Sequence, residues 1–302
     1  MPEIVAIGAC NTDLVVTVDE FPRPGQTVLA KDLRRFLGGK GANQAVAARR
    51  LGADAAFLAR IGMDPYGEEQ AQALAREGLD PAHLLRDDPG PSGLALIALD
   101  GQAQNMIIVA AGSNGRLSPE DLEQKRPLLE AAKLILLELE IPLATVERAL
   151  EIARAAGVKT LLNPAPAVPL GPEALALCDY LVPNETEAEV ITGIKVRDLD
   201  SCRAAAAWLE RRGVQNVILT LGERGAFWNG RIFAAEKVKV VDTVAAGDAF
   251  IGALAAEVVA GRALGPAIAF ANRAAAIAVS RSGAMPSLPT RAEVEAFFPE
   301  TG

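Results

Sequence analysis

An aspartate in the first turn of a predicted helix is well placed to do chemistry in this chain. Residues 242–248 read DTVAAGD, and their small side chains lead directly into an alanine-rich helical pattern. The first amides of a helix have no partner within it, so the amides near Ala246 and Gly247 form a site for a phosphoryl group. Asp248 would accept a hydroxyl proton there. The alternative is an aspartate that only stabilises the start of a helix.

A second glycine-rich turn, residues 36–44 with the sequence FLGGKGANQ, also joins a predicted strand to a helix. It is not a Walker A loop, because Gly41 stands where that motif needs Ser or Thr after the lysine. Lys40 and Asn43 offer polar groups to a hydroxylated ligand, and the alternative is a structural turn. Asn11 and Asp13 follow the first predicted strand, at the sheet edge where open α/β sheets bind ligands.

Two further segments follow predicted strands. Residues 183–189, PNETEAE, open a helix with acids in its first turn, which is ordinary for a helix start. An acidic pair beside a polyphosphate would instead bind Mg²⁺ through water. Residues 220–225, TLGERG, end a strand with two glycines, where the backbone can approach a nucleotide; a hairpin turn into 226–228 is the alternative.

The elements that position these residues alternate along the chain. Short aliphatic runs predict buried strands, and amphipathic runs that stop at glycine predict helices. This alternation predicts an α/β fold with helices on both faces of a mainly parallel sheet. The predicted strands are Ile4–Gly8, Ala55–Ile61, Leu134–Leu137, Thr160–Leu162, Tyr180–Val182 and Val217–Leu221. The predicted helices are Ala42–Leu51, Glu68–Glu77, Leu143–Ala156, Cys202–Arg212, Ala246–Ala260, Pro266–Ser280 and a final one near Arg291–Phe298.

Two β-ribbons interrupt the alternation. One pairs Leu14–Val18 with Thr27–Ala30, and the other pairs Leu94–Leu99 with Asn105–Ala111. If the ribbons pair with each other, they form a small β-sheet lid, over about 12–37 and 91–112, above the carboxyl edge of the main sheet. The run Leu94–Leu99 is apolar on both faces, so we expect a second copy of the chain to cover the lid in a homodimer. No linker marks a boundary, and we expect one domain over 1–302.

The composition removes several classes of function. The chain has 302 residues, of which 50% are hydrophobic and 23% charged, enough for a large aliphatic core. One histidine, His83, and three widely spaced cysteines exclude zinc fingers and disulfide scaffolds and favour a reducing compartment. The net charge of −8 gives no basic surface for nucleic acid, and no apolar run approaches a membrane span of about 20 residues. We therefore expect a cytoplasmic protein.

Taken together, the loops resemble one family, the ribokinase-like (PfkB) carbohydrate kinases. Residues 38–44 resemble its N-terminal signature and residues 242–248 its C-terminal one, in the same order and over almost the full length. Residues 11–13, 21–25, 163–167 and 183–189 narrow the resemblance to the members that phosphorylate ribose. The resemblance implies a three-layer αβα sandwich with a small β-sheet lid, and a clasp between the lids of two subunits.

The resemblance also implies roles for individual residues. Asp248 corresponds to the catalytic base, next to an anion hole made by the amides of Ala245, Ala246 and Gly247. The sugar contacts correspond to Asn11, Asp13, Gly39, Lys40, Asn43, Glu140 and Asp248. The ATP contacts correspond to Asn184, Thr220, Gly222, Gly225, Gly247 and Asn272, and Glu187 would organise the waters around Mg²⁺. An activating monovalent cation, K⁺, corresponds to Asp242, Val244, Ala278, Arg281, Gly283 and Ser287.

The implied reaction is transfer of the γ-phosphoryl group of ATP to the 5-hydroxyl of D-ribose. Alternatives within the family are kinases of nucleosides, deoxyribose or fructose, which share both glycine motifs. A sugar- or nucleotide-binding regulator without catalysis is a further alternative, although the intact pair Gly247 and Asp248 argues against it. A dinucleotide-dependent dehydrogenase has no support, because the first strand runs into residues 8–13, GACNTD, without a GxGxxG motif.

Overall fold

A parallel sheet lies at the centre of the molecule. The computed structural model describes residues 1–88, 90–101 and 104–298. Within this part of the chain, seven strands form the central sheet in the order β11-β10-β9-β8-β1-β4-β5, and all its pairs are parallel. The strands are β1 (Ile4–Ile7), β4 (Ala55–Gly62), β5 (Leu84–Asp87), β8 (Leu134–Leu137), β9 (Lys159–Leu162), β10 (Tyr180–Leu181) and β11 (Asn216–Val217).

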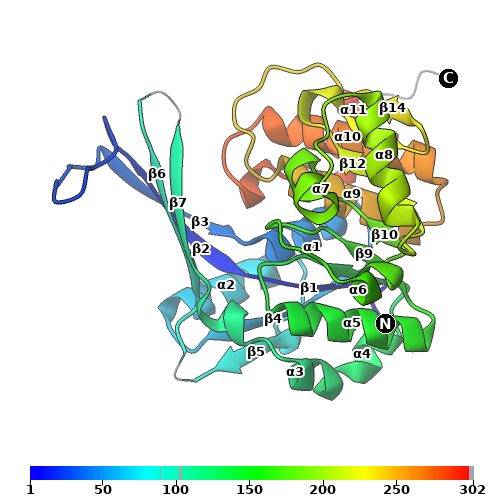
Figure 1. The fold of residues 1–302 in the computed structure, drawn as a ribbon. Helices are drawn as coiled ribbons and strands as arrows, with labels where there is room; N and C mark the ends of the chain where they lie inside the picture. Colours follow the sequence, from blue (N-terminus) through cyan, green and yellow to red (C-terminus); the bar gives the residue numbers. More distant parts are fainter. Residues whose placement is uncertain (89, 102–103, 299–302) are drawn as a thin grey trace.

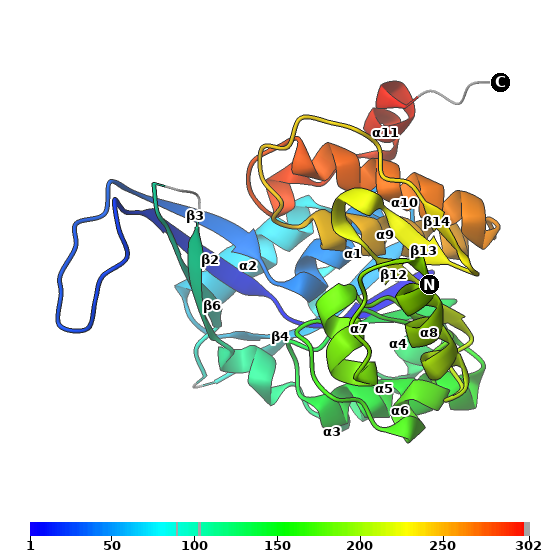
Figure 2. The ribbon, with the colours of Figure 1, turned by 45° about the horizontal axis from the view of Figure 1, so that its top comes forward.

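Helices cover both faces of this sheet (Figures 1 and 2). One layer contains α1 (Lys40–Arg50), α2 (Pro65–Arg76), α9 (Ala246–Val259), α10 (Leu264–Val279) and α11 (Arg291–Phe297). The other contains α3 (Pro119–Gln124), α4 (Arg126–Glu130), α5 (Leu143–Ala156), α6 (Pro172–Ala176), α7 (Glu185–Thr192) and α8 (Leu199–Glu210). The predicted α/β fold is confirmed, and α5 has the predicted bounds and ends at Gly157, whose φ is 72°.

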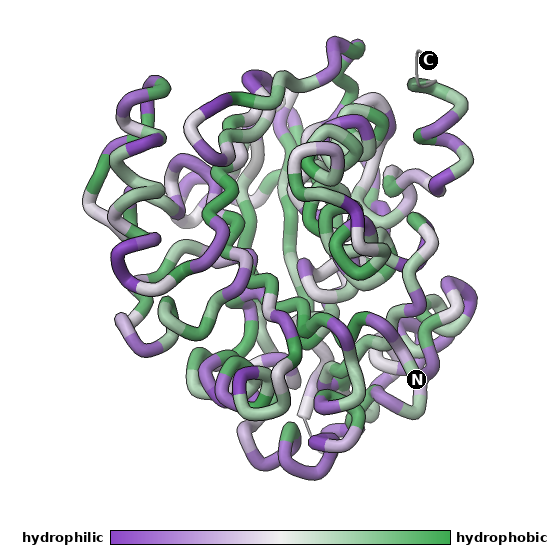
Figure 3. Tube along the Cα trace, turned by 90° about the vertical axis from the view of Figure 1, so that its right-hand side faces the viewer, coloured by the Kyte–Doolittle hydropathy of each residue, from purple (hydrophilic) through white to green (hydrophobic). Residues whose placement is uncertain are grey.

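The core consists of two apolar layers, one on each face of the central sheet. Alternate residues of β1 point to opposite sides: Ile4 and Ala6 pack into one layer, and Val5 and Ile7 into the other. Figure 3 shows the apolar strand segments passing through the middle of the molecule between helices. Burial on both faces explains why these strands are continuous aliphatic runs in the sequence.

A separate sheet, the lid sheet, stands off the main body (Figure 1). In the described residues it has four strands in the order β3-β2-β6-β7. These are β2 (Asn11–Thr17), β3 (Asp32–Gly38), β6 (Gly93–Leu99) and β7 (Asn105–Ala110). The two ribbons pair with each other through parallel β2 and β6, with Asn11 opposite Gly93. Residues 102 and 103, within the range expected for the lid, lie outside the described residues.

One strand of the first ribbon was predicted wrongly. Residues Thr27–Ala30 form no strand, and the partner of β2 is instead β3, whose register runs from Asp32 opposite Thr17 to Gly38 opposite Asn11. The partner strand must end at Gly38, because the turn into α1 starts there. Charged side chains on β3, among them Arg34 and Arg35, hide its alternating pattern.

The predicted strand Val217–Leu221 is divided between two sheets. Residues Asn216–Val217 form β11 of the central sheet, whereas β12 (Leu219–Thr220) pairs with β13 (Ala226–Trp228). The strand β14 (Arg231–Phe233) completes a small antiparallel sheet. The tight turn over Gly222–Arg224 returns the chain onto β12, and this hairpin draws the end of the apolar run away from the central sheet.

Candidate active site between the lid sheet and the central sheet

Two cavities meet at Asp248. The larger, about 630 Å³, lies between the lid sheet and the starts of α1 and α9, and its walls include Asn11, Asp13 and Glu140. The smaller, about 240 Å³, lies beside α7 and α9 and has Asn184 and Glu187 in its wall. Both cavities are lined by Lys40, Thr243, Ala245 and Asp248. A group bound in one cavity therefore meets a group bound in the other at the first turn of α9.

The start of α9 combines a helix terminus with a buried carboxylate. Ala245 precedes the helix in the left-handed region with φ 59°, and Asp248 in the first turn is buried. Gly247 is exposed, and a Cβ added there would meet no neighbour within 4 Å. The amides of this turn have no intrahelical acceptors and carry the positive end of the helix dipole. The amide of Ala246 donates to the carbonyl oxygen of Thr243 at 3.4 Å, and a helix start of this kind suits an anionic group.

Neutral amides hold the carboxylate of Asp248. Nδ2 of Asn43 donates to Oδ2 at 2.9 Å, and Nε2 of Gln44 donates to Oδ1 at 3.0 Å. Each carboxylate oxygen keeps a further lone pair for another donor. This leaves Asp248 able to accept a hydrogen bond from a hydroxyl group.

The turn before α1 is built from glycines for steric reasons. Gly39 has φ 89°, and a Cβ there would lie 2.7 Å from the carbonyl oxygen of Ala9. At Gly38 a Cβ would lie 2.1 Å from Oδ2 of Asp13. These glycines let the turn pack directly against β1 and β2, so that Lys40 and Asp13 line the same cavity.

Negative charge is concentrated around Lys40. Burial acts to lower the pKa of Lys40, but the carboxylates of Asp248, Glu140, Glu138 and Glu187 together raise it. The backbone amide of Lys40 also donates to Oε2 of Glu140 at 3.1 Å. Lys40 is therefore a cation held where the two cavities meet.

The pKa values of the neighbouring carboxyl groups are also raised, which for an acid favours the neutral form. Burial, followed by the negative charges of Glu140 and Asp248, raises the pKa of Asp13 to about 7. Burial likewise raises the pKa of Glu140, against the effect of Lys40. An uncharged polyol with several hydroxyl groups suits such a set of closely spaced acceptors, because it adds donors without adding negative charge.

The residues predicted to bind ATP fall into two groups. Asn184, Glu187 and Thr220 line the smaller cavity, with Asn184 and Thr220 joined by a parallel β-bridge. The amide and side chain of Asn184 donate to Glu187 at 2.8 Å each in a capping box. Burial raises the pKa of Glu187.

Gly247 also lines this cavity, whereas Gly222, Gly225 and Asn272 lie outside its lining. Gly222 is exposed with open space beside it, whereas a Cβ at Gly225 would lie 2.0 Å from the carbonyl oxygen of Phe233. Nδ2 of Asn272 donates to Phe233 at 2.9 Å and to Ala234 at 3.2 Å. In this structure Gly225 and Asn272 therefore fix the chain after β14.

Asp242 links three of the predicted cation residues, itself, Val244 and Gly283, across two loops. Oδ1 of Asp242 accepts from the amide of Val244, and Oδ2 accepts from the amide of Gly283, both at 3.0 Å. Nearby, the carbonyl oxygen of Ala278 accepts from the amide of Arg281, whose side chain pairs with Glu293 at 2.7 Å. Ser287 is fully buried. Because a guanidinium group has no acceptor atom, Arg281 can offer a cation only its backbone carbonyl oxygen.

Four polar residues of the site were not predicted from the sequence. Glu138 is fully buried and accepts from the amides of Ala9 at 2.6 Å and Glu140 at 2.5 Å. Asn114 donates to Oδ1 of Asn11 at 2.7 Å. Gln44 and Asn163 bond to each other at 3.0 Å behind Asp248. Glu138 and Asn114 lie in no motif or periodic pattern of the sequence. Gln44 and Asn163 lie within motifs 38–44 and 163–167, but nothing in the pattern indicates their partners.

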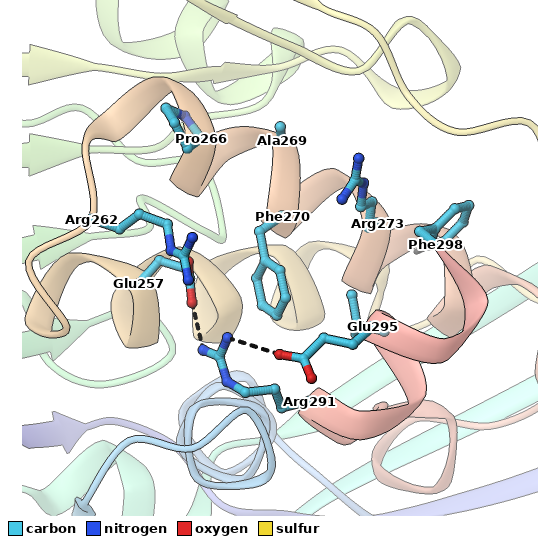
Figure 4. Close-up of a pocket in the computed structure, with 10 residues that line it drawn as sticks. Glu257, Arg262, Pro266, Ala269, Phe270, Arg273, Arg291, Glu295 and Phe298 are labelled. Carbon is cyan, nitrogen blue, oxygen red and sulfur yellow. Dashed lines mark hydrogen bonds and ion pairs between the residues drawn. The ribbon is translucent and has the colours of Figure 1, made fainter. Parts of the chain in front are cut away.

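A second cleft of about 560 Å³ lies between the C-terminal part of α9, α10 and α11 (Figure 4). Glu257, fully buried, is paired there with Arg262 and with Arg291, the latter at 2.5 Å. Arg291 also donates to the carbonyl oxygen of Leu51 at 2.8 Å and stacks over Phe270. This cluster joins the C-terminal ends of α1 and α9, the two helices whose N-terminal ends hold Asn43 and Asp248.

The described residues contain no group of three or more His, Cys, Asp or Glu side chains arranged to hold a metal ion. None of the described helices is both long enough and apolar enough to cross a membrane.

A parallel α/β sheet with a lid, a helix-start anion site and a carboxylate shared by two cavities defines a small-molecule phosphotransferase class. The family model described as pfkB family carbohydrate kinase matches residues 1–291. The chain belongs to this family.

Individual proteins that are similar to this chain support its assignment to the family. A ribokinase of Haemophilus influenzae is 40% identical over 98% of each chain. A deoxyribokinase of Salmonella typhi is 37% identical over 95% of this chain and 96% of its own. The solved structure of Arabidopsis thaliana ribokinase complexed with ribose and ATP has a TM-score of 0.91 and 32% identity, covering 98% of each chain.

Proposed function

We propose that this protein is a ribokinase, which transfers the γ-phosphoryl group of ATP to the 5-hydroxyl of D-ribose. The observation that carries the proposal is the position of Asp248 in the wall shared by the two cavities. The relatives named as ribokinases, and the Arabidopsis structure named as a complex with ribose and ATP, support ribose as the sugar and ATP as the donor.

In this proposal ribose occupies the larger cavity. Asn11, Asp13, Gly39, Lys40, Asn43 and Glu140 surround it with donors and acceptors. A polyol epimer with one hydroxyl in the wrong place would leave a buried group without a partner, which costs about 1–3 kcal/mol. The 5-hydroxyl then points to Asp248.

The transfer step depends mainly on positioning and charge. Asp248 accepts the 5-hydroxyl proton as the oxygen attacks the γ-phosphorus and the bond from phosphorus to the bridging oxygen of ADP breaks. The amides at Ala245, Ala246 and Gly247 hold the negative oxygens of the phosphoryl group in flight. Lys40, a cation next to both cavities, stabilises the same charge.

ATP occupies the smaller cavity and the open surface next to it. Asn184, Thr220, Gly222, Gly225 and Asn272 form or support this nucleotide side. The carboxylate of Glu187 fits Mg²⁺, because it lies in the cavity wall and Mg²⁺ takes oxygen ligands, often through water. When bound, Mg²⁺ neutralises charge on the phosphates.

K⁺ suits the loops that meet at Asp242. A carboxylate and backbone carbonyls form an all-oxygen set, which is the donor chemistry that a hard monovalent cation needs. Val244, Ala278, Arg281, Gly283 and Ser287 complete the set. Because Asp242 already binds the amides of Val244 and Gly283, a cation there would stiffen the chain that leads into the anion hole.

We also propose that the lid sheet forms a homodimer. On its outward face Leu96 and Ile108 lie opposite each other and are 48% and 60% exposed. The substitution Ile108→Asp should convert the dimer to a monomer in sedimentation equilibrium, whereas Val190→Asp on α7 should not. A wild-type monomer at micromolar concentration would contradict the proposed homodimer.

The three cysteines are buried free thiols, which supports a cytoplasmic location.

The substrate is tested with purified protein, Mg-ATP and a panel of D-ribose, 2-deoxyribose, fructose and adenosine in a coupled ADP-release assay. Ribose should give the highest kcat/KM, and K⁺ should increase the rate. One similar protein, from Salmonella typhi, is named a deoxyribokinase, so deoxyribose is the main alternative substrate. A higher kcat/KM for deoxyribose than for ribose would overturn the choice of sugar. Absence of ADP with every compound would indicate a binding protein without catalysis.

A further inference from the structure

Gln44 lies between the proposed catalytic base and the nucleotide side of the site. Its Nε2 donates to Oδ1 of Asp248 and to Oδ1 of Asn163, both at 3.0 Å. Asn163 in turn donates to the carbonyl oxygen of Val182 at 3.1 Å, at the end of β10 and two residues before Asn184. Both hydrogens of the Gln44 amide are therefore used, and Gln44 itself is fully buried.

The close packing of α1 and α9 makes these contacts possible. A Cβ at Gly252 would lie 2.4 Å from Cβ of Ala47 and 2.8 Å from the carbonyl oxygen of Gln44. Gly252 lies one helical turn after Asp248, so both face α1. The glycine brings the helix axes close enough for a glutamine side chain to reach Asp248.

The two side-chain amides that hold Asp248 are uncharged, which matters because Asp248 is the proposed base. Lys40 lines both cavities beside Asp248, and an unrestrained carboxylate would turn toward this cation. Two amide donors, from Asn43 and Gln44, instead fix the plane of the carboxylate without cancelling its charge. Asn43 also lines the sugar cavity, whereas Gln44 lines neither cavity.

We propose that Gln44 is a positioning residue for phosphoryl transfer, acting only through Asp248, whose carboxylate it holds toward the substrate hydroxyl. The inference rests on the proposed function, because it requires Asp248 to act as the base. Gln44 touches no substrate in this proposal. Its loss should therefore lower kcat and leave both KM values nearly unchanged.

A double-mutant cycle tests the proposal. In the wild-type background Gln44→Met should lower kcat by about 10–100-fold, with KM for sugar and for Mg-ATP within about twofold. In the Asp248→Asn background the same substitution should change the residual rate by less than about twofold, because the group it acts through is gone. The cycle is run with whichever sugar the wild-type protein prefers.

Gln70→Met is the matched control. Gln70 is also fully buried, and its Nε2 donates to Thr12 at 3.2 Å, away from Asp248. Its substitution should change the rate by the same factor in both backgrounds. If Gln44→Met fails to fold, as judged by circular dichroism and Tm, Gln44→Leu is used in the same cycle, since it also removes the donor and adds no charge beside Asp248.

The outcomes separate the two proposals. Equal losses from Gln44→Met in both backgrounds, or a rise in KM at constant kcat, would overturn the role of Gln44 while the kinase assignment stands. A wild-type protein that releases no ADP with any sugar would overturn the kinase assignment and this inference together. A loss confined to the wild-type background supports both.

Discussion

Nδ2 of Asn43 lies 2.9 Å from Oδ2 of Asp248, although the two residues are 205 positions apart in the sequence. The glycine turn before α1 and the small-residue turn before α9 thus meet at one hydrogen bond. Asn43 faces the larger cavity, and Asp248 faces both. This contact joins the turn proposed to bind the sugar to the turn proposed to hold the phosphoryl group.

The carboxyl group of Asp13 should make the protein less stable as the pH rises. Its pKa in the folded protein is raised from 3.8 to about 7, so between these values the folded state binds the proton more tightly than the unfolded chain. Stability from this group is therefore greatest at acid pH and is lost as the pH rises through about 7. Asp13→Asn removes the effect and should raise Tm at pH 8.

Thermal unfolding of both proteins from pH 5 to pH 8 measures this effect. The Tm advantage of Asp13→Asn should grow with pH, and KM for ribose should increase in the variant. A Tm difference that does not change over this range would contradict the assignment of the raised pKa to Asp13.

The substitution Gly38→Ala should damage sugar binding selectively. The new Cβ would lie 2.1 Å from Oδ2 of Asp13, so the carboxylate or the turn must move. A displaced carboxylate loses its hydrogen bond to the sugar, which is worth about 1.5–3 kcal/mol for a charged group and corresponds to roughly tenfold or more in KM for ribose. Steady-state kinetics should show KM for Mg-ATP unchanged.

Gly115→Ala is the control for this change, because its Cβ would make only an ordinary contact, 3.5 Å from Cβ of Ala111. It should leave both KM values unchanged. Equal rises in both KM values for Gly38→Ala would show that the turn does not serve the sugar in particular.

Glu257 should matter for stability and not for catalysis. Glu257→Ala removes a fully buried carboxylate but leaves Arg262 and Arg291, whose side chains are 48% and 30% exposed, within reach of water. The cost should therefore lie below the value for a fully buried pair, which is about 3–5 kcal/mol. Thermal unfolding should show a clear drop in Tm, whereas kcat measured well below Tm stays near the wild-type value. Glu295→Ala, whose carboxylate is 3.7 Å from Arg291 and 63% exposed, should cost less than about 1 kcal/mol. Similar Tm values for the two variants would rule out a structural role for the Glu257 cluster.

The sequence predicted the parts of the fold that are encoded locally. Buried strands such as β8 are continuous aliphatic runs, and helices such as α5 end at a glycine, so their bounds could be found from pattern alone. The strand β3 was missed because exposed arginines, Arg34 and Arg35, stand on both of its faces and leave no alternation of apolar and polar residues. The strand β12 was misassigned because an apolar run does not reveal which sheet it joins.

Some residues of the candidate site could be predicted from the sequence and others could not. Asp248 and Asn43 stand in motifs at helix starts, where residue type and position indicate chemistry. Glu138 and Asn114 could not be found in this way, because their roles depend on contacts with Ala9 and Asn11 across more than a hundred residues. Such long-range hydrogen bonds become visible only once the chain is folded.

The measurement that tests the account most directly is ribose-dependent release of ADP by the wild-type protein and by Asp248→Asn, together with calorimetric titration of ribose. We expect the substitution to lower kcat by about 10²–10⁴-fold, while ribose binds with nearly the wild-type affinity. Near-wild-type turnover by Asp248→Asn would contradict the assignment of Asp248 as the base that joins the two cavities.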